Sequence, residues 1–178
     1  GNGSAMRVSS VAWLNPSYNK MLEKAEQSAE VTHNHPEGIK GAQATATSIW
    51  LAIEGFDAVE IRHIISDAFG YDLSESVDDI RKWYYFNETC QKTVPQAIIC
   101  ALEATGFEDA IRNAISIGGD SDTVAAITGS IAEAMFGIPD DIADKAKSCL
   151  PEEFLDILDR ASIVVDHAQS AAPSAYVS

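Results

Sequence analysis

The stretch Ile117-Gly118-Gly119-Asp120-Ser121-Asp122-Thr123-Val124-Ala125-Ala126-Ile127-Thr128-Gly129 decides how the rest of the chain is interpreted. Two glycines lead into a cluster of oxygen-bearing side chains, and an apolar segment of helical character follows. Carboxylate and hydroxyl oxygens are ligands for Mg²⁺, Mn²⁺ or Ca²⁺ rather than for softer metals. Two neighbouring carboxylates also repel each other unless a helix N-terminus or a cation supplies positive charge. The stretch therefore predicts a helix that begins with a site for a hard divalent cation.

A simpler interpretation of the same residues is helix capping. Aspartate and serine are common N-cap residues, and acidic groups in a first turn interact favourably with the helix dipole. A cap needs one good acceptor, whereas this loop has two glycines and three oxygen-bearing side chains, at Asp120, Asp122 and Thr123. Both interpretations stay open, and the additional oxygen ligands favour the metal site. Within the following helix, Gly129 predicts close packing against a neighbouring element.

Composition restricts the function classes that fit the chain. The 178 residues are 46% hydrophobic, which is typical of a folded domain with a sizeable core. The formal net charge is −15, with 27 acidic against 12 basic residues, so nucleic-acid backbones and anionic membranes are unfavourable partners. Cys90, Cys100 and Cys149 show neither disulfide nor zinc spacing. With no leader or membrane-length apolar run, we expect reduced thiols in a cytoplasmic protein.

Apolar residues recur at spacings of three and four along most of the chain, and strand signals are nearly absent. This pattern predicts an all-α fold, in which residues 1–178 form a single irregular multi-helix bundle with a frayed tail over 170–178. Thr93 and Pro95 are expected to cap and open one of the helices. The expected helices cover residues 18–29, 39–53, 58–69, 76–81, 96–104, 107–116, 123–136, 140–147 and 152–168.

Two other segments carry candidate binding residues. The polar turn Gly1–Ser4 could hold a phosphate or a ribose on its backbone N–H groups, or it could be a simple capped turn. The segment 32–38 is a loop by composition and contains His33 and His35; without a cysteine or a third histidine nearby, zinc binding is disfavoured. Arg7 could pair with a phosphate or form a buried structural ion pair.

The stretch from Ile117 to Ile127 resembles the C-terminal metal motif of the ADP-ribosylglycohydrolases, the family that includes the dinitrogenase reductase-activating glycohydrolase. Further similar motifs follow the same order along most of the chain: residues 1–7 (GNGSAMR), 32–42 (THNHPEGIKGA), 93–96 (TVPQ) and 107–129. The resemblance implies the irregular helical bundle of this family. It also implies a two-metal hydrolase, using Mg²⁺ or alternatively Mn²⁺, that cleaves the bond at C1″ of the distal ribose of ADP-ribose or of an ADP-ribosylated protein.

Roles for individual residues follow from the same resemblance. It assigns Asp120, Asp122 and Thr123 as metal ligands, and the two aspartates as the catalytic residues. The residues that it places against ADP-ribose are Gly1, Asn2, Gly3, Ser4, His33, Gly119 and Ser121.

The chain also departs from the family pattern. Family members carry a second acidic motif, Thr-Asp-Asp, near their N-terminus, and no residue precedes Gly1 to supply it. Asp78 and Asp79 follow Val77 rather than a threonine, and they lie in the wrong order. We therefore expect an N-terminally truncated site that needs a missing N-terminal segment or a second chain, with weak or no activity alone. The alternatives are a non-catalytic ADP-ribose-binding or structural protein, like the family's lens-crystallin relatives, and a regulatory helical module without a metal.

Overall fold

The computed structural model describes residues 1–171, with side chains for residues 1–166. All regular structure within this part of the chain is helical, which confirms the predicted all-α fold. The expected frayed tail lies outside the described residues except for Ser170 and Ala171, which are still helical. The elements are α1 (Gly3–Met6), α2 (Ser9–Leu14), α3 (Tyr18–His33), α4 (Pro36–Ile53), α5 (Ala58–Phe69), α6 (Val77–Ile80), the 3₁₀ helix η1 (Cys90–Lys92), α7 (Val94–Leu102), α8 (Phe107–Ser116), α9 (Ser121–Phe136), α10 (Asp140–Lys147) and α11 (Glu152–Ala171).

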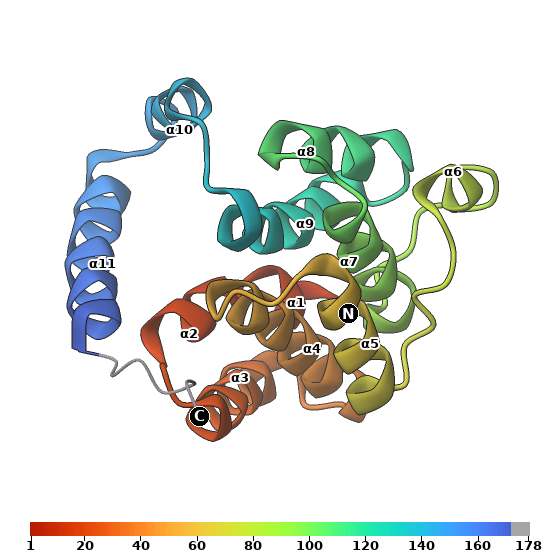
Figure 1. Cartoon of the computed structure of the whole chain (residues 1–178), viewed down its shortest axis with the longest axis horizontal. Helices are drawn as coiled ribbons and strands as arrows, with labels where there is room; N and C mark the ends of the chain where they lie inside the picture. The colour runs from red at the N-terminus through yellow and green to blue at the C-terminus, as the bar shows by residue number, and fades with distance from the viewer. Residues whose placement is uncertain (172–178) are drawn as a thin grey trace.

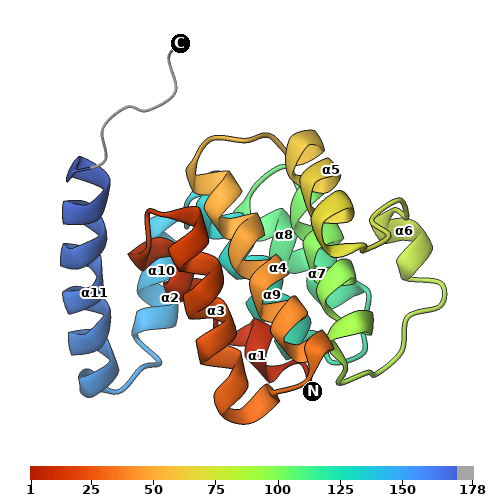
Figure 2. The ribbon, with the colours of Figure 1, turned by 90° about the horizontal axis from the view of Figure 1, so that it is seen from below.

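Helices α4, α7 and α9 form the centre of the bundle, and α1, α2, α3, α5 and α8 surround them (Figures 1 and 2). Every residue of α7 is buried, which is typical of a helix covered on all sides. The hydroxyl of Thr128 on α9 donates to the carbonyl of Ala97 on α7 at 2.9 Å. Gly129 confirms the predicted close packing, because a Cβ there would lie 3.0 Å from Cδ1 of Ile111 on α8.

Local sequence explains several helix ends. Asp57 and Glu60 form a reciprocal capping box at the start of α5, and Gly70 ends that helix in the left-handed conformation. Helix α4 begins at Pro36 rather than at residue 39, because the side chain of His35 caps it. The predicted cap at Thr93 is wrong, because its side chain makes no capping hydrogen bond and contacts other parts of the chain instead.

The N-terminal segment differs most from the sequence prediction. The turn predicted at Gly1–Ser4 is partly helical, since α1 begins at Gly3, and a short break at Arg7 and Val8 separates α1 from α2. The buried ion pair considered for Arg7 is not formed. Its guanidinium is exposed and donates to the carbonyl of Ser28 on α3.

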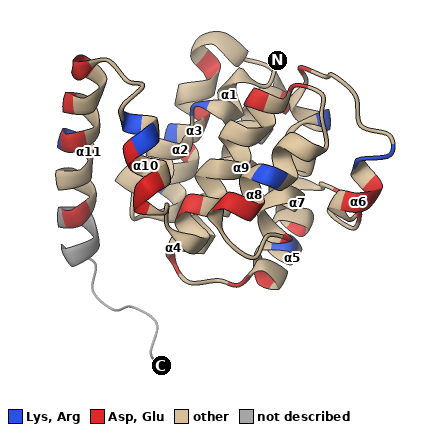
Figure 3. Ribbon diagram, turned by 90° about the horizontal axis from the view of Figure 1, so that it is seen from above, with Lys and Arg blue, Asp and Glu red and all other residues tan. Residues whose placement is uncertain are grey.

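The last two helices lie at one side of the bundle (Figure 1). Helix α11 packs against α2, and α10 has no buried residue. Figure 3 shows acidic residues on the outer helices α6, α10 and α11, in agreement with the large negative net charge. Among the described helices, none combines the length and the apolarity needed to cross a membrane.

Candidate functional site

The acidic loop opens α9, two residues earlier than the sequence predicted. Gly118 and Gly119 precede it with φ angles of +75° and +70°, a region that favours glycine. Asp120 occupies the N-cap position, but its side chain accepts no hydrogen bond from the first turn. Capping is therefore not what Asp120 does, and its carboxylate is left for another partner.

That partner is Asn2, which lies 118 residues away in the sequence. The Asn2 amide donates to Oδ2 of Asp120 at 2.8 Å and to the hydroxyl of Thr93 at 3.2 Å. The Thr93 hydroxyl in turn donates to the carbonyl of Asn87 at 3.1 Å. Asn2 is 8% exposed and Thr93 is fully buried, so the hydrogen bond between them is shielded from water, and the Asn2 amide orients the partly buried Asp120 carboxylate.

The ring of Tyr84 packs against the same loop at Gly119. A Cβ on Gly119 would lie 2.5 Å from Cε1 of Tyr84 and 3.2 Å from the carbonyl oxygen of Tyr85, so this position has no room for a side chain. Burial and the nearby charge of Asp120 raise the pKa of the Tyr84 phenol. The Asp120 carboxylate thus opposes ionisation of this phenol.

Hydrogen bonds to Gly38 and Cys90 stabilise the turn Gly1–Ser4. The Ser4 hydroxyl donates to the carbonyl of Gly38 at 2.7 Å, and the Cys90 thiol donates to the carbonyl of Gly1 at 3.3 Å. Gly41 makes room for that thiol, because a Cβ there would lie 2.5 Å from Cys90 Sγ. The Asn2 and Ser4 side chains form hydrogen bonds within the protein. Any ligand at this turn would therefore contact its backbone, including that of Gly1 and Gly3.

His33 lies at the end of α3 rather than in a loop, and its ring lies against Gly1 and Gly3 of this turn. An ideal Cβ would lie 3.1 Å from His33 Nε2 at Gly1 and 3.0 Å from it at Gly3, so the ring edge approaches only because both residues are glycines. A cavity of about 560 Å³ opens beside His33, Gly1 and Cys90. Partial burial lowers the pKa of His33, and the charge of Arg7 acts in the same direction.

The turn thus lies between the two other predicted parts of the site, because Gly1 and Gly3 meet His33 while Asn2 reaches Asp120. Asp122 is exposed, and Ser121 and Gly119 lie beside Asp120 at the head of α9. These placements bring the residues that the sequence singled out into one region.

The oxygen atoms present fit a magnesium ion in kind but not in number. Asp120, Asp122 and Thr123 lie within one helical turn, and Thr123, which is 7% exposed, donates its hydroxyl to the sulfur of Met6 at 3.7 Å. Six oxygens surround each Mg²⁺ in its preferred octahedral geometry. Among the described residues, no group of three or more histidine, cysteine, aspartate or glutamate side chains is placed to hold a metal.

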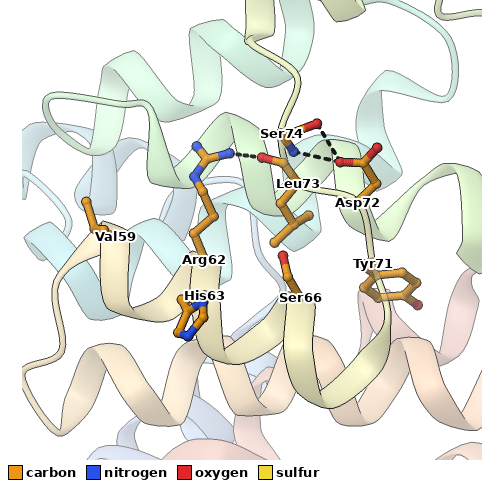
Figure 4. A pocket seen from close by; sticks show the side chains of 8 residues that line it. All are labelled: Val59, Arg62, His63, Ser66, Tyr71, Asp72, Leu73 and Ser74. Atoms are coloured by element: carbon orange, nitrogen blue, oxygen red, sulfur yellow. Dashed lines mark hydrogen bonds between the residues drawn. The ribbon is translucent and has the colours of Figure 1, made fainter.

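A second hollow, of about 370 Å³, lies between α5 and the segment 71–74 (Figure 4). Arg62 spans it and donates to the carbonyl of Leu73, while Asp72 accepts from the backbone and hydroxyl of Ser74. None of the residues predicted for the site lines this hollow.

Sequence reasoning missed Thr93, Tyr84 and Cys90 as parts of the site. The sequence predicts Thr93 as a helix cap and Cys90 as an ordinary thiol, and no sequence motif singles out Tyr84. Their roles depend on contacts with residues far away in the chain, so no local pattern identifies them. The sequence connects the segments 1–7 and 93–96 with the acidic loop only because all three resemble motifs of the same family.

Comparison with known proteins bears on the family and the fold of the chain. The family model for ADP-ribosylglycohydrolase matches residues 1–173. Human ADP-ribosylhydrolase ARH3 is 28% identical over 205 aligned positions, which cover 89% of this chain and 56% of the relative. The ADP-ribosylarginine hydrolase Tri1 of Pseudomonas putida is 30% identical over 149 positions, covering 78% of this chain and 39% of that protein. The chain thus spans about half the length of these relatives, or less.

A solved structure described as an ADP-ribosylglycohydrolase-related protein complex has the same fold. It superposes with a TM-score of 0.66 at 21% identity, over 93% of this chain and 58% of the other. The family match covers nearly the whole sequence, and the structural match supports the same helical architecture. The chain therefore belongs to the ADP-ribosylglycohydrolase family.

Proposed function

We propose that this chain provides the ADP-ribose-binding turn and one acidic half of the centre of a magnesium-dependent hydrolase that releases ADP-ribose from a modified protein side chain or a related conjugate. The observation that carries the proposal is the hydrogen bond of 2.8 Å between Asn2 and Asp120. It joins the turn that would hold the ligand to the loop that would hold the metal, across most of the length of the chain.

The acidic loop supplies the proposed reaction centre. The Asn2 amide occupies one oxygen of Asp120 and fixes the carboxylate plane, so the other oxygen keeps a defined direction. The exposed Asp122 carboxylate and the Thr123 hydroxyl complete the proposed ligand set of this loop. When bound, Mg²⁺ supplies Lewis-acid polarisation and a lowered pKa for a coordinated water.

The turn and His33 supply the proposed ADP-ribose contacts. Backbone N–H groups at Gly1–Ser4 suit an anionic diphosphate, and the ring edge of His33 suits a polar group of the ribose or diphosphate. Gly119 and Ser121 stand beside the catalytic Asp120 and Asp122 on the metal side. The cavity of about 560 Å³ beside His33 provides space for part of such a ligand.

Calorimetric titration with Mg²⁺ and Mn²⁺ tests the metal site. We expect weak binding that is lost in Asp122→Ala, because the loop supplies only part of an octahedral ligand set. Asp141→Ala is the matched control, because Asp141 is also an exposed acid in the first turn of a helix. Equal heats from all three proteins would show that the loop holds no cation.

Titration with ADP-ribose tests the ligand site. His33→Ala should weaken binding by about 1–2 kcal/mol, the usual effect of losing one polar contact. His63→Ala, at an exposed position on α5, is the control. Unchanged affinity for ADP-ribose in His33→Ala would show that the ligand does not bind beside His33.

Release of free ADP-ribose, followed by chromatography, separates an enzyme from a binding protein. Because the described ligands do not complete two octahedral magnesium ions, we expect background turnover of ADP-ribosylated arginine or O-acetyl-ADP-ribose by this chain alone. A longer version with a Thr-Asp-Asp segment should be active with Mg²⁺ and inactive with chelator. Binding without turnover in both versions would favour the non-catalytic alternative, and full turnover by this chain alone would show that other residues build the site.

A further inference from the structure

Arg7 and Thr32, to which the proposed function gives no role, make a hydrogen-bonded connection to His33. Nη2 of Arg7 lies 2.6 Å from the carbonyl oxygen of Ser28 and 2.8 Å from the hydroxyl of Thr32. The Thr32 hydroxyl lies 2.7 Å from Nδ1 of His33. The connection therefore runs from the exposed Arg7 guanidinium, through the exposed Thr32 hydroxyl, to Nδ1 of the histidine ring.

The donors and acceptors in this connection can be assigned from chemistry. A guanidinium only donates, so Arg7 occupies a lone pair on the Thr32 oxygen and another on the carbonyl of Ser28. The hydroxyl proton of Thr32 then has the Nδ1 lone pair of His33 as its near acceptor. The positive charge of Arg7 strengthens that hydroxyl as a donor. It also opposes protonation of Nδ1, which would give the ring its second proton and a positive charge.

We propose that Arg7 and Thr32 are positioning residues that hold His33 as the neutral tautomer with its proton on Nε2. The ring then presents an N–H donor, rather than a lone pair, to the side occupied by Gly1 and Gly3. Those two residues lack side chains, and an ideal Cβ on either would come within 3.1 Å of Nε2. Because Gly1 and His33 both line the cavity, an acceptor oxygen bound there beside Gly1 would meet the Nε2–H donor.

The inference rests on the proposed function only for the identity of the ligand. The acceptor oxygen belongs to a phosphate or to a ribose hydroxyl of ADP-ribose, and both present the same chemistry to Nε2–H. Inorganic phosphate and ADP-ribose are therefore used as separate probes. The tautomer itself is a property of the protein without ligand and is measured independently.

Nitrogen NMR of the uniformly labelled full chain tests the tautomer at about pH 8, well above the ordinary pKa of histidine, where the ring is neutral. In the unmodified protein, Nδ1 should resonate as an unprotonated nitrogen and Nε2 as a protonated one. In Thr32→Val, which keeps the shape of the side chain, the two signals should move toward each other because both tautomers are populated. Arg7→Met should produce a smaller movement in the same direction.

Two controls accompany this measurement. Nδ1 of His35 accepts from the backbone N–H of Glu37 at 3.2 Å, so its tautomer is fixed independently and its signals should not move. Thr89→Val removes another hydroxyl on the same cavity, one that donates to Asn87, and should leave the His33 signals unchanged. If His33 carries its proton on Nδ1, or if Thr32→Val leaves its signals in place, the inference is overturned.

Ligand titrations separate this inference from the proposed function. Thr32→Val should weaken ADP-ribose binding about two- to tenfold, as expected for a misdirected polar contact. A shift of His33 Nε2 with inorganic phosphate assigns the acceptor to a phosphate, whereas a shift with ADP-ribose alone assigns it to the ribose. If neither probe binds, the proposed function fails, while the nitrogen shifts still decide the tautomer.

Discussion

Substituting Gly119 by alanine should destabilise the protein more than the same change at its neighbour Gly118. Both glycines have positive φ angles, of +70° and +75°. They differ in surroundings: a Cβ at Gly119 would lie 2.5 Å from the Tyr84 ring, whereas one at Gly118 would have no atom within 4 Å. Gly118→Ala is therefore a matched control for the backbone strain alone.

The expected magnitudes follow from these contacts. An alanine in the left-handed region costs about 1–2 kcal/mol, so Gly118→Ala should lower the free energy of unfolding by about that amount. At Gly119, the overlap with Tyr84 adds the cost of overpacking, about 1–3 kcal/mol. The sum for Gly119→Ala is about 2–5 kcal/mol, and relief of the overlap would also displace the adjacent Asp120.

Urea unfolding followed by circular dichroism measures both variants. Combining Gly119→Ala with Tyr84→Ala should bring its cost down toward that of Gly118→Ala, since the ring that causes the overlap is gone. The reasoning is refuted if the two alanine variants lose equal stability, or if truncating Tyr84 leaves the cost of Gly119→Ala unchanged. Either result would place the ring away from the acidic loop.

Three further outcomes are expected. Thr93→Val should lower the free energy of unfolding by about 1–3 kcal/mol in urea, because the buried Asn2 amide and a carbonyl each lose a partner; a neutral effect would contradict the hydrogen-bond chain. Native protein should react with a thiol reagent near neutral pH at the exposed Cys149 and not at Cys100, whose pKa burial raises to about 12; fast labelling of Cys100, located by mass spectrometry, would contradict its burial. Tyr71→Phe should change stability by less than about 0.5 kcal/mol, because the buried hydroxyl makes no hydrogen bond in the described structure; a loss above about 1 kcal/mol would reveal one.

Much of the helical architecture could be predicted from the sequence. Apolar spacing located the helices between residues 18 and 168, and glycines marked several of their ends, as Gly70 does for α5. The errors lie at helix boundaries: α3, for example, continues to His33 instead of ending at residue 29. Helix α4 begins at Pro36 because His35 caps it, and α9 begins at Ser121 because the acidic loop enters the helix directly. The start of α4 depends on a side-chain hydrogen bond that periodicity does not report, whereas α9 begins without a side-chain cap.

The acidic loop was recognisable because its chemistry is contiguous. Asp120, Asp122 and Thr123 fall within one helical turn, so their nearness follows from the sequence alone. Whether Asp120 caps its helix could not be decided in this way. Capping and metal binding require the same residue types, and the choice depends on where the carboxylate points.

The sequence by itself determined the helical fold, the family resemblance and the oxygen-rich loop, because periodicity, ordered motifs and local spacing are all written along the chain. Only the tertiary structure decided that Asn2, and not the first turn of α9, binds Asp120, and that Thr93 supports Asn2 instead of capping α7. The physical reason is that a hydroxyl or an amide has several possible partners of similar strength. Packing selects among them by deciding which are brought close and shielded from water, and here it brought together residues 118 positions apart.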